Sequence, residues 1–258
     1  MQNYKTPYNQ DFPINGTTNA WEYYFKQPLD YTLDEVYNSQ NVIVGSGQYF
    51  YANVPYSEVT FWKNERNISK LANVISENIR FNDTTMNYCK EQYNAIIGDK
   101  SNVLCVSARS PKYGTSMLGH PLQPTSDELF TKVKEYFERW NMEWIFLSTD
   151  CADYINMFKE HFKDKILHID FSKKMFFDIN TYAYINDIGE SRQPREVSTY
   201  QNTISYISQI WIASKCDSIV CSIANGSAAA LEFNNNRYKH KYIFDFGTVD
   251  RPKPRNLS

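Results

Sequence analysis

Residues 102–124 read NVLCVSARSPKYGTSMLGHPLQP, and this stretch decides which fold the chain adopts. The short apolar run 103–106 predicts a buried strand. Arg109 follows the strand, and a loop with proline and glycine then leads toward a helix. Ligands of open α/β sheets bind just beyond the carboxyl ends of the strands, and a guanidinium can hold a phosphate with two hydrogen bonds. The stretch therefore predicts either a phosphate-binding arginine at a sheet edge or a solvated loop charge.

Strands and helices alternate through the rest of the C-terminal half. The expected strands span residues 103–107, 144–148, 166–169, 218–221 and 241–246. After the first strand, Thr125 with Glu128 three residues later forms a capping box that opens a helix. Short strands that alternate with helices predict an α/β fold, with a parallel sheet covered by helices on both faces.

The N-terminal half shows weaker patterns. We expect a short helix over 33–37, a strand over 41–44 and a helix from about residue 69. A second helix is expected over 83–97, with Asp83 as its cap and Gly98 as its end. The two consecutive helices that end at Gly98 predict a boundary between a domain of residues 1–99 and a domain of residues 100–258.

The composition excludes several classes of protein. The formal net charge of the 258 residues is −2, which is not the broad positive charge of a nucleic-acid-binding protein. The five cysteines contain no C-x-x-C pair, and with four scattered histidines they form no zinc pattern. We expect buried cysteines in a reducing compartment. No stretch is apolar enough to cross a bilayer, which predicts a cytoplasmic protein; peripheral membrane association and a homodimer both stay open.

Polar residues follow four of the predicted strands at the same edge of the sheet. They are Arg109, Asp150, Asp170 and the segment 222–227. Arg109 supplies positive charge to a diphosphate, and the Asp170 carboxylate can accept the paired N–H donors of a guanine edge. In the last segment, Asn225, Gly226 and Ser227 open a helix, whose first N–H groups and dipole favour an anion.

Each of these residues also has a plainer interpretation. Asp150 can be the cap of the following helix, and Asp170 can simply end a strand. An Asn-Gly pair such as Asn225-Gly226 most often marks a turn. His120, which precedes a proline, is as readily a packed loop residue as a general base. Only their shared position at one sheet edge favours the functional interpretation.

Several well-known motifs are absent from the sequence. There is no G-x-G-x-x-G, no Walker loop and no G-x-S-x-G, so nicotinamide enzymes, P-loop NTPases and serine hydrolases are not indicated. The pair Asp150 and Asp153 does not have the spacing of a metal-binding D-x-D. We therefore expect chemistry that needs no metal and no cofactor.

The segment Val106-Ser107-Ala108-Arg109, followed by Gly119-His120-Pro121-Leu122-Gln123-Pro124, resembles the arginine motif of GDP-fucose-dependent fucosyltransferases. That superfamily includes the α-1,2-, α-1,6- and protein O-fucosyltransferases. Further segments resemble family motifs in the same order along the chain: 19–25 (NAWEYYF), 145–150 (IFLSTD), 215–222 (KCDSIVCS) and 224–227 (ANGS). The resemblance extends from about residue 17 to residue 246.

This resemblance implies a GT-B-like fold with two facing Rossmann-like domains. The donor would bind to the C-terminal domain, residues 100–258. Residues 1–99 would form a smaller, incomplete α/β domain on the acceptor side, because the chain begins downstream of the family's first strand and Gly-rich loop. The implied activity is an inverting, metal-independent transfer of fucose or a related sugar from a GDP-sugar to a glycan acceptor in bacterial surface polysaccharide synthesis.

The resemblance also implies roles for individual residues. Arg109 would hold the diphosphate and stabilise charge on the departing GDP, and His120 is the candidate catalytic base. Ser107 stands where the family commonly has a histidine, and Lys112 where it has an acid. The other implied donor-binding residues are Ser107, Asp150, Asp170, Ser222, Asn225, Gly226 and Ser227. Two alternatives stay open: a non-catalytic or truncated GDP-sugar-binding protein of the same fold, and a GT-B transferase that uses another nucleotide sugar.

Overall fold

A parallel sheet forms the centre of the fold in a computed structural model that describes residues 12–29, 31–40, 59–109, 121–149, 151–169 and 199–248. The sheet has five strands in the order β3-β2-β1-β4-β5, and every neighbouring pair is parallel. The strands are β1 (Val103–Ala108), β2 (Trp144–Thr149), β3 (Ile166–Leu167), β4 (Ser218–Cys221) and β5 (His240–Ile243). The predicted parallel α/β sheet is confirmed, although β3 and β5 are shorter than expected.

All the strands are parallel, but the direction in which the chain adds them to the sheet reverses at β1. The chain builds outward from β1 to β2 and β3, and then crosses back to add β4 and β5 on the other side of β1. Ser107 of β1 consequently pairs with Ser148 of β2 and with Cys221 of β4. In open α/β sheets, ligands bind beyond the carboxyl ends of the strands at such a reversal. The edge that β1 and β4 share is therefore the place to look for a site.

Both faces of the sheet are buried, which explains why its strands are apolar without interruption. Cys105, Phe146 and Ile219 join the core on one face. Leu104, on the neighbouring position of β1, joins the core on the other face, as do Ile145 and Val220. This alternation follows from the two-residue period of a strand.

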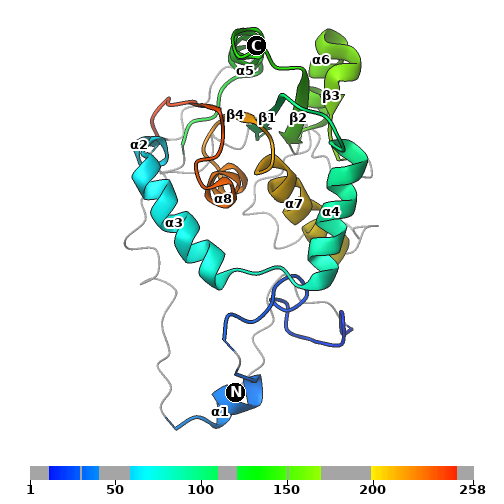
Figure 1. The fold of residues 1–258 in the computed structure, drawn as a ribbon, viewed down its shortest axis with the longest axis vertical. Coiled ribbons are helices and arrows are strands. Elements are labelled where there is room, and N and C mark those ends of the chain that lie inside the picture. The colour runs from blue at the N-terminus through cyan, green and yellow to red at the C-terminus, as the bar shows by residue number, and fades with distance from the viewer. Residues whose placement is uncertain are drawn as a thin grey trace, which may run out of the picture.

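Helices cover the two faces as predicted. The helices α5 (Ser126–Arg139) and α6 (Ala152–Phe162) pack on one face, with the short 3₁₀ helix η3 (Lys163–Lys165) after α6. The other side holds α2 (Val59–Lys63), α3 (Glu65–Asn78), α4 (Asp83–Ile96), α7 (Thr199–Ala213) and α8 (Asn225–Asn234). Figure 1 shows α8 nearly end-on in the middle of this layer, between α3 and α7.

The ends of two helices test the cap predictions directly. The Thr125 N–H donates to Glu128 Oε2 at 2.8 Å and the Glu128 N–H donates to Thr125 Oγ1 at 3.3 Å, so the capping box is confirmed. Gly98 follows α4 with a φ of +57°, the left-handed conformation that ends helices, as predicted. The predicted cap Asp83 is wrong by one residue, because the Asn82 side chain accepts the Thr85 N–H at 2.9 Å.

The five cysteines lie in the core, and no disulfide joins any of them. Burial raises the pKa of Cys89 to about 12 and the pKa of Cys221 well above its usual range. These thiols are protonated and unreactive at neutral pH, which confirms that they act as core residues.

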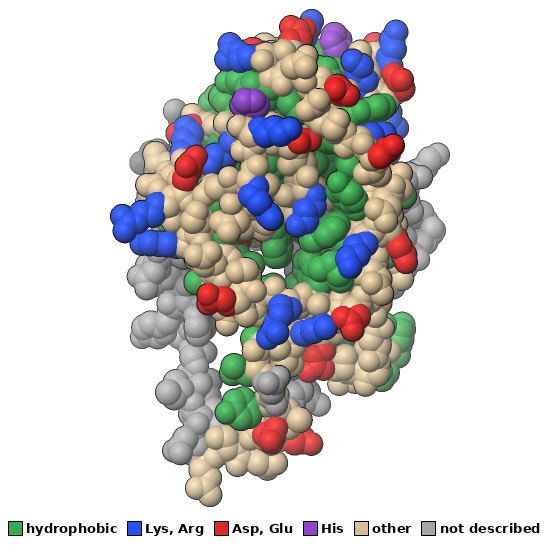
Figure 2. Space-filling view, in the orientation of Figure 1, with side chains coloured by type: hydrophobic (Ala, Val, Ile, Leu, Met, Phe, Trp, Pro, Cys, Tyr) green, Lys and Arg blue, Asp and Glu red, His purple; other side chains and the backbone are tan. Residues whose placement is uncertain are grey.

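The described surface carries charges of both signs. The face that Figure 2 shows carries both Lys and Arg side chains and Asp and Glu side chains. Among the helices that the structure describes, none combines the length and the apolar character needed to cross a bilayer.

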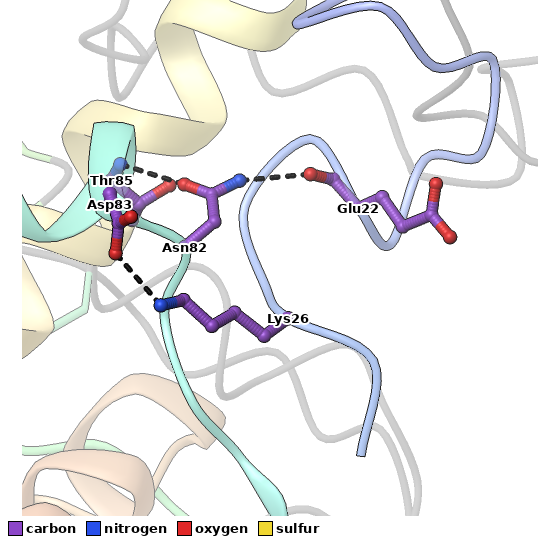
Figure 3. Close-up of polar contacts among 5 residues, drawn as sticks. All are labelled: Glu22, Lys26, Asn82, Asp83 and Thr85. Atoms are coloured by element: carbon purple, nitrogen blue, oxygen red, sulfur yellow. Dashed lines mark hydrogen bonds and ion pairs between the residues drawn. The ribbon is translucent and has the colours of Figure 1, made fainter. Parts of the chain in front are cut away.

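The N-terminal segment is attached to the helical layer through the start of α4. Asn82 Nδ2 donates to the backbone oxygen of Glu22 at 2.8 Å (Figure 3). The same nitrogen donates to the backbone oxygen of Tyr23 at 3.0 Å. Beside this contact, Lys26 Nζ lies 2.8 Å from Asp83 Oδ1. The ring of Tyr24, which follows Tyr23, stacks on that of Tyr200 in α7. Residues 12–29 are thus held between α4 and α7.

The predicted helix over 33–37 is confirmed as α1 (Leu33–Asn38), which lies far from the sheet in Figure 1. The predicted strand over 41–44 lies outside the described residues. Trp62 and Ile97 belong to the same buried cluster as the sheet residue Cys105. The division of the chain between residues 99 and 100 stays a prediction.

Candidate functional site

The candidate site lies where β1 and β4 end side by side. Arg109 is half-buried and directly follows β1, while Ser222 directly follows β4. The Ser222 N–H donates to the Ser107 backbone oxygen at 3.4 Å, which joins the two strand ends. The structure therefore brings together Ser107, Arg109 and the segment 222–227 at the reversal of the strand order.

The segment after β4 turns sharply into α8, as the Asn-Gly-Ser sequence predicts. Ala224 is the N-cap, and its N–H donates to Ser227 Oγ at 2.9 Å. The same hydroxyl donates back to the Ser222 backbone oxygen at 2.6 Å. The hydroxyl of Ser227 therefore shapes the turn, and its predicted contact with a ligand stays a prediction.

The start of α8 is a favourable environment for an anion. The first N–H groups of a helix, here those of Asn225, Gly226 and Ser227, have no acceptor within the helix, and the helix dipole is positive at this end. The permanently charged Arg109 guanidinium stands at the neighbouring strand end. A positive side chain beside a helix N-terminus can hold a phosphate or a diphosphate.

Gly226 leaves room for the side chain of a neighbouring tyrosine. A Cβ atom at this position would lie 2.6 Å from the hydroxyl oxygen of Tyr206 in α7, so a larger residue would require the end of the Tyr206 side chain to move. Tyr206 is 38% exposed, so its side chain is partly open to solvent beside the start of α8. Sequence reasoning missed Tyr206, because only the packing of α7 on α8 brings the two residues together.

Two buried glutamines tie the strand ends, and sequence reasoning gave neither of them a role. Gln123, 5% exposed, donates through Nε2 to the Ile223 backbone oxygen at 3.2 Å. Gln209 of α7 donates to the backbone oxygen of Thr149, the last residue of β2, at 3.3 Å. In the sequence, the only sign of these roles is an amide side chain beside apolar residues. Each amide bonds to a residue at least sixty positions away, so the local sequence does not identify its partner.

Three of the predicted site residues, His120, Asp150 and Asp170, lie outside the described residues. The N-cap of α6 is Cys151, whose N–H donates to Thr149 Oγ1 at 3.2 Å. Within the described ranges, no group of three or more His, Cys, Asp or Glu side chains is placed to hold a metal ion. The predicted independence from metals and cofactors stays a prediction.

Asp217, in the segment KCDSIVCS, acts at the opposite end of the sheet. Its Oδ2 accepts the Val103 N–H at 2.9 Å and its Oδ1 pairs with Lys239 Nζ at 2.9 Å. Burial by itself raises the pKa of this carboxyl, but the hydrogen bonds from Lys239 and Val103 lower the pKa below its usual value. This motif residue is therefore structural and lies away from the site.

The comparisons with known proteins give matches in structure and none in sequence. No protein-family model matches the chain, and no curated protein matches it by sequence. The chain is similar in structure to the fucosyltransferase NodZ from Bradyrhizobium, with 11% identity, a TM-score of 0.49 and coverage of 89% of this chain and 80% of that one. A structure of the NodZ α-1,6-fucosyltransferase soaked with GDP-fucose matches with 12% identity, a TM-score of 0.47 and coverage of 84% and 76%.

A third match is POFUT1 in complex with GDP, with 10% identity, a TM-score of 0.42 and coverage of 70% of this chain and 52% of that one. The similarity is to fucosyltransferase structures. At identities of 10–12%, these are similarities between structures only.

Proposed function

We propose that this chain is an inverting glycosyltransferase that transfers fucose, or a related sugar, from a GDP-sugar to a glycan acceptor without a metal ion. The supporting observation is that Arg109 and the first turn of α8 lie at the ends of adjacent strands, β1 and β4, where the strand order reverses. The ordered motifs of the sequence independently favour a GDP-sugar. We further propose a cytoplasmic enzyme of bacterial surface polysaccharide synthesis.

The proposed reaction uses the site as an electrostatic clamp. An acceptor hydroxyl attacks the anomeric carbon of the sugar while the bond from that carbon to the diphosphate oxygen breaks, and the configuration inverts. Arg109 and the α8 N–H groups stabilise the negative charge that develops on the departing GDP. We propose that His120 takes the proton of the acceptor hydroxyl and that Asp170 accepts the guanine N–H donors.

The first prediction concerns the binding of GDP. Because Arg109 would hold the diphosphate with charge-assisted hydrogen bonds, Arg109→Ala should weaken the binding of GDP by about 2 kcal/mol or more. Arg109→Lys keeps the charge but loses the planar fork, so its affinity should be intermediate. The measurement is isothermal titration calorimetry of the wild-type chain and of both variants.

A matched control is Arg139→Ala, because Arg139 lies on α5 in an exposed ion pair with Glu135 and should leave the affinity unchanged. An Arg109→Ala variant that binds GDP as tightly as the wild-type chain would remove Arg109 from the site. UDP and CDP are compared with GDP in parallel thermal-shift measurements, and a preference for UDP would support a transferase that uses another nucleotide sugar.

Turnover separates an enzyme from a binding protein. The wild-type chain with GDP-fucose should release GDP, slowly by hydrolysis and faster when a suitable glycan acceptor is present. His120→Ala should retain its affinity for GDP and lose most of the transfer rate. Tight binding of GDP without any release from GDP-fucose would instead support a non-catalytic protein.

A further inference from the structure

One buried side chain, that of Gln123, holds the two residues that lead from β4 toward the candidate site. Gln123 follows β1 by a loop, and its Nε2 donates both to the Pro121 backbone oxygen at 3.0 Å and to the Ile223 backbone oxygen at 3.2 Å. Its Oε1 accepts a hydrogen bond from Ser222 Oγ. The amide therefore connects residues 121–123 to the two residues that immediately follow β4.

These partners determine the orientation of the amide. Two carbonyl oxygens require the two hydrogens of Nε2, and the hydroxyl of Ser222 supplies a donor for Oε1. The reverse orientation would bury Oε1 against carbonyl oxygens, which is costly at a position that is only 5% exposed.

The segment that holds Gln123 is also attached on its other side. The Leu122 N–H donates to the Gly247 backbone oxygen at 2.9 Å, and Pro121 forms a bridge with Thr248. Residues 121–123 are therefore tied to the chain after β5 as well as to the chain after β4. Because residues 121–123 are held on both sides, they should restrict the movement of Ile223, which lies two residues before the start of α8.

We propose that Gln123 is a positioning residue for the donor diphosphate, because it holds Ser222 and Ile223, which lead into α8, against a segment that is itself tied to the chain after β5. This inference rests on the proposed function. An anion that is shared between a guanidinium and a helix N-terminus needs both at hydrogen-bonding distance at once, and such bonds weaken steeply when a partner moves.

The test removes the link without removing a ligand contact. Gln123→Met has a similar size but no hydrogen bonds to Ile223 and Ser222. It should weaken the binding of GDP by at least about tenfold, because more than one buried hydrogen bond is lost. In an Arg109→Ala background the same substitution should have almost no further effect, since the clamp that Gln123 aligns is already missing.

A second variant gives a readout in pH. In Gln123→Glu, the ionised carboxylate would face the Ile223 oxygen and repel it, whereas the protonated acid can donate to that oxygen and still accept from Ser222. The affinity of Gln123→Glu for GDP should therefore recover as the pH falls, and that of Gln123→Met should not. Should Gln123→Met not fold, Gln123→Glu provides the test by itself, because an affinity for GDP that does not recover as the pH falls would overturn the inference.

The control for a general loss of stability is Asn234→Ala. Asn234 is a buried amide at the far end of α8, where Nδ2 donates to the Ser214 oxygen at 2.9 Å. This variant should unfold at a lower temperature yet bind GDP like the wild-type chain at a temperature where both are folded.

Two results would overturn the inference while the proposed function stands. One is a wild-type chain and a Gln123→Met variant that bind GDP equally well, whatever their melting temperatures. The other is a loss of affinity in Gln123→Met that persists in full in the Arg109→Ala background. A wild-type chain that does not bind GDP would instead overturn the proposed function itself, and the inference with it.

Discussion

At the scale of single residues, Glu232 stands out among the described Asp and Glu residues whose pKa is shifted, because its carboxyl group is buried. It lies on α8 with 7% of its surface exposed, and its Oε1 has no hydrogen-bond partner in the part of the chain that the structure describes. Burial raises its pKa to about 7, because the low-dielectric core disfavours the charged form. At neutral pH the fold therefore contains a carboxyl group that is only partly ionised.

This environment predicts an unusual dependence of stability on pH. Between about pH 4.5 and pH 7 the folded state binds more protons at Glu232 than the unfolded state. The contribution of Glu232 to the free energy of unfolding is therefore fully present at low pH, and up to about 3 kcal/mol is lost as the pH rises through the folded pKa. Glu232→Gln should remove this loss and be more stable than the wild-type chain at pH 8. Urea unfolding at pH 5 and at pH 8 measures both effects.

Glu138→Gln, at an exposed position of α5, is the matched control and should leave the pH dependence unchanged. Equal losses of stability in the wild-type chain and in Glu232→Gln between pH 5 and pH 8 would contradict this prediction. They would show that burial does not raise the pKa of Glu232 in the folded state.

At the scale of an element, Asn82, the residue immediately before α4, has two separate functions. The Asn82 side chain caps the helix through Oδ1 and, through Nδ2, holds the backbone oxygens of Glu22 and Tyr23. The sequence predicts a cap near this position, and either Asn82 or Asp83 satisfies that requirement locally. The second function depends on residues about sixty positions away, so no local pattern distinguishes the two candidates.

Substitutions of Asn82 should separate these functions. Asn82→Ala loses the cap and the two bonds to the N-terminal segment, and should lower the free energy of unfolding by about 2 kcal/mol. Asn82→Asp keeps a good cap at a helix N-terminus but turns a carboxylate toward two carbonyl oxygens. It should therefore release residues 12–29, which limited proteolysis detects, with α4 intact by circular dichroism.

Asp83→Asn is the control for this pair. It removes only the ion pair with Lys26, whose two side chains are 50% and 88% exposed, and such pairs contribute little. Release of residues 12–29 by Asp83→Asn and not by Asn82→Asp would show that the ion pair, rather than the amide, attaches the segment.

At the scale of the whole molecule, the two ends of the sheet have different functions. The carboxyl ends of β1 and β4 carry the candidate site. At the amino ends, Asp217 joins three strands: its carboxylate accepts the Val103 N–H of β1, and its backbone oxygen accepts the Lys239 N–H just before β5 at 2.7 Å. A residue of one motif thus supports the sheet from the end opposite the site.

Asp217→Ala should therefore lower stability and leave ligand binding intact. The loss of the carboxylate that accepts the Val103 N–H should lower the free energy of unfolding by about 1–2 kcal/mol. Lys239→Ala should have a smaller effect, because that side chain is 60% exposed. Chemical unfolding measures both, and a folded Asp217→Ala variant that no longer binds GDP would place Asp217 in the ligand site after all.

The sequence by itself determined the features that depend on neighbouring residues. The apolar run 103–106 predicts β1 because its side chains are compatible with burial on both faces of a sheet, and Thr125 and Glu128 form their capping box within one helical turn. Gly98 likewise ends α4 through its own backbone freedom. These signals are local, so they can be recognised without knowledge of the fold.

Only the tertiary structure decided how these elements come together. The same alternation of strands and helices is compatible with several strand orders, and the order β3-β2-β1-β4-β5 is what brings Arg109 beside the start of α8. The hydrogen bond between Gln123 and Ile223 spans one hundred residues, and Tyr206 meets Gly226 only through helix packing. Such contacts depend on the positions of whole elements, and no short stretch of sequence contains that information.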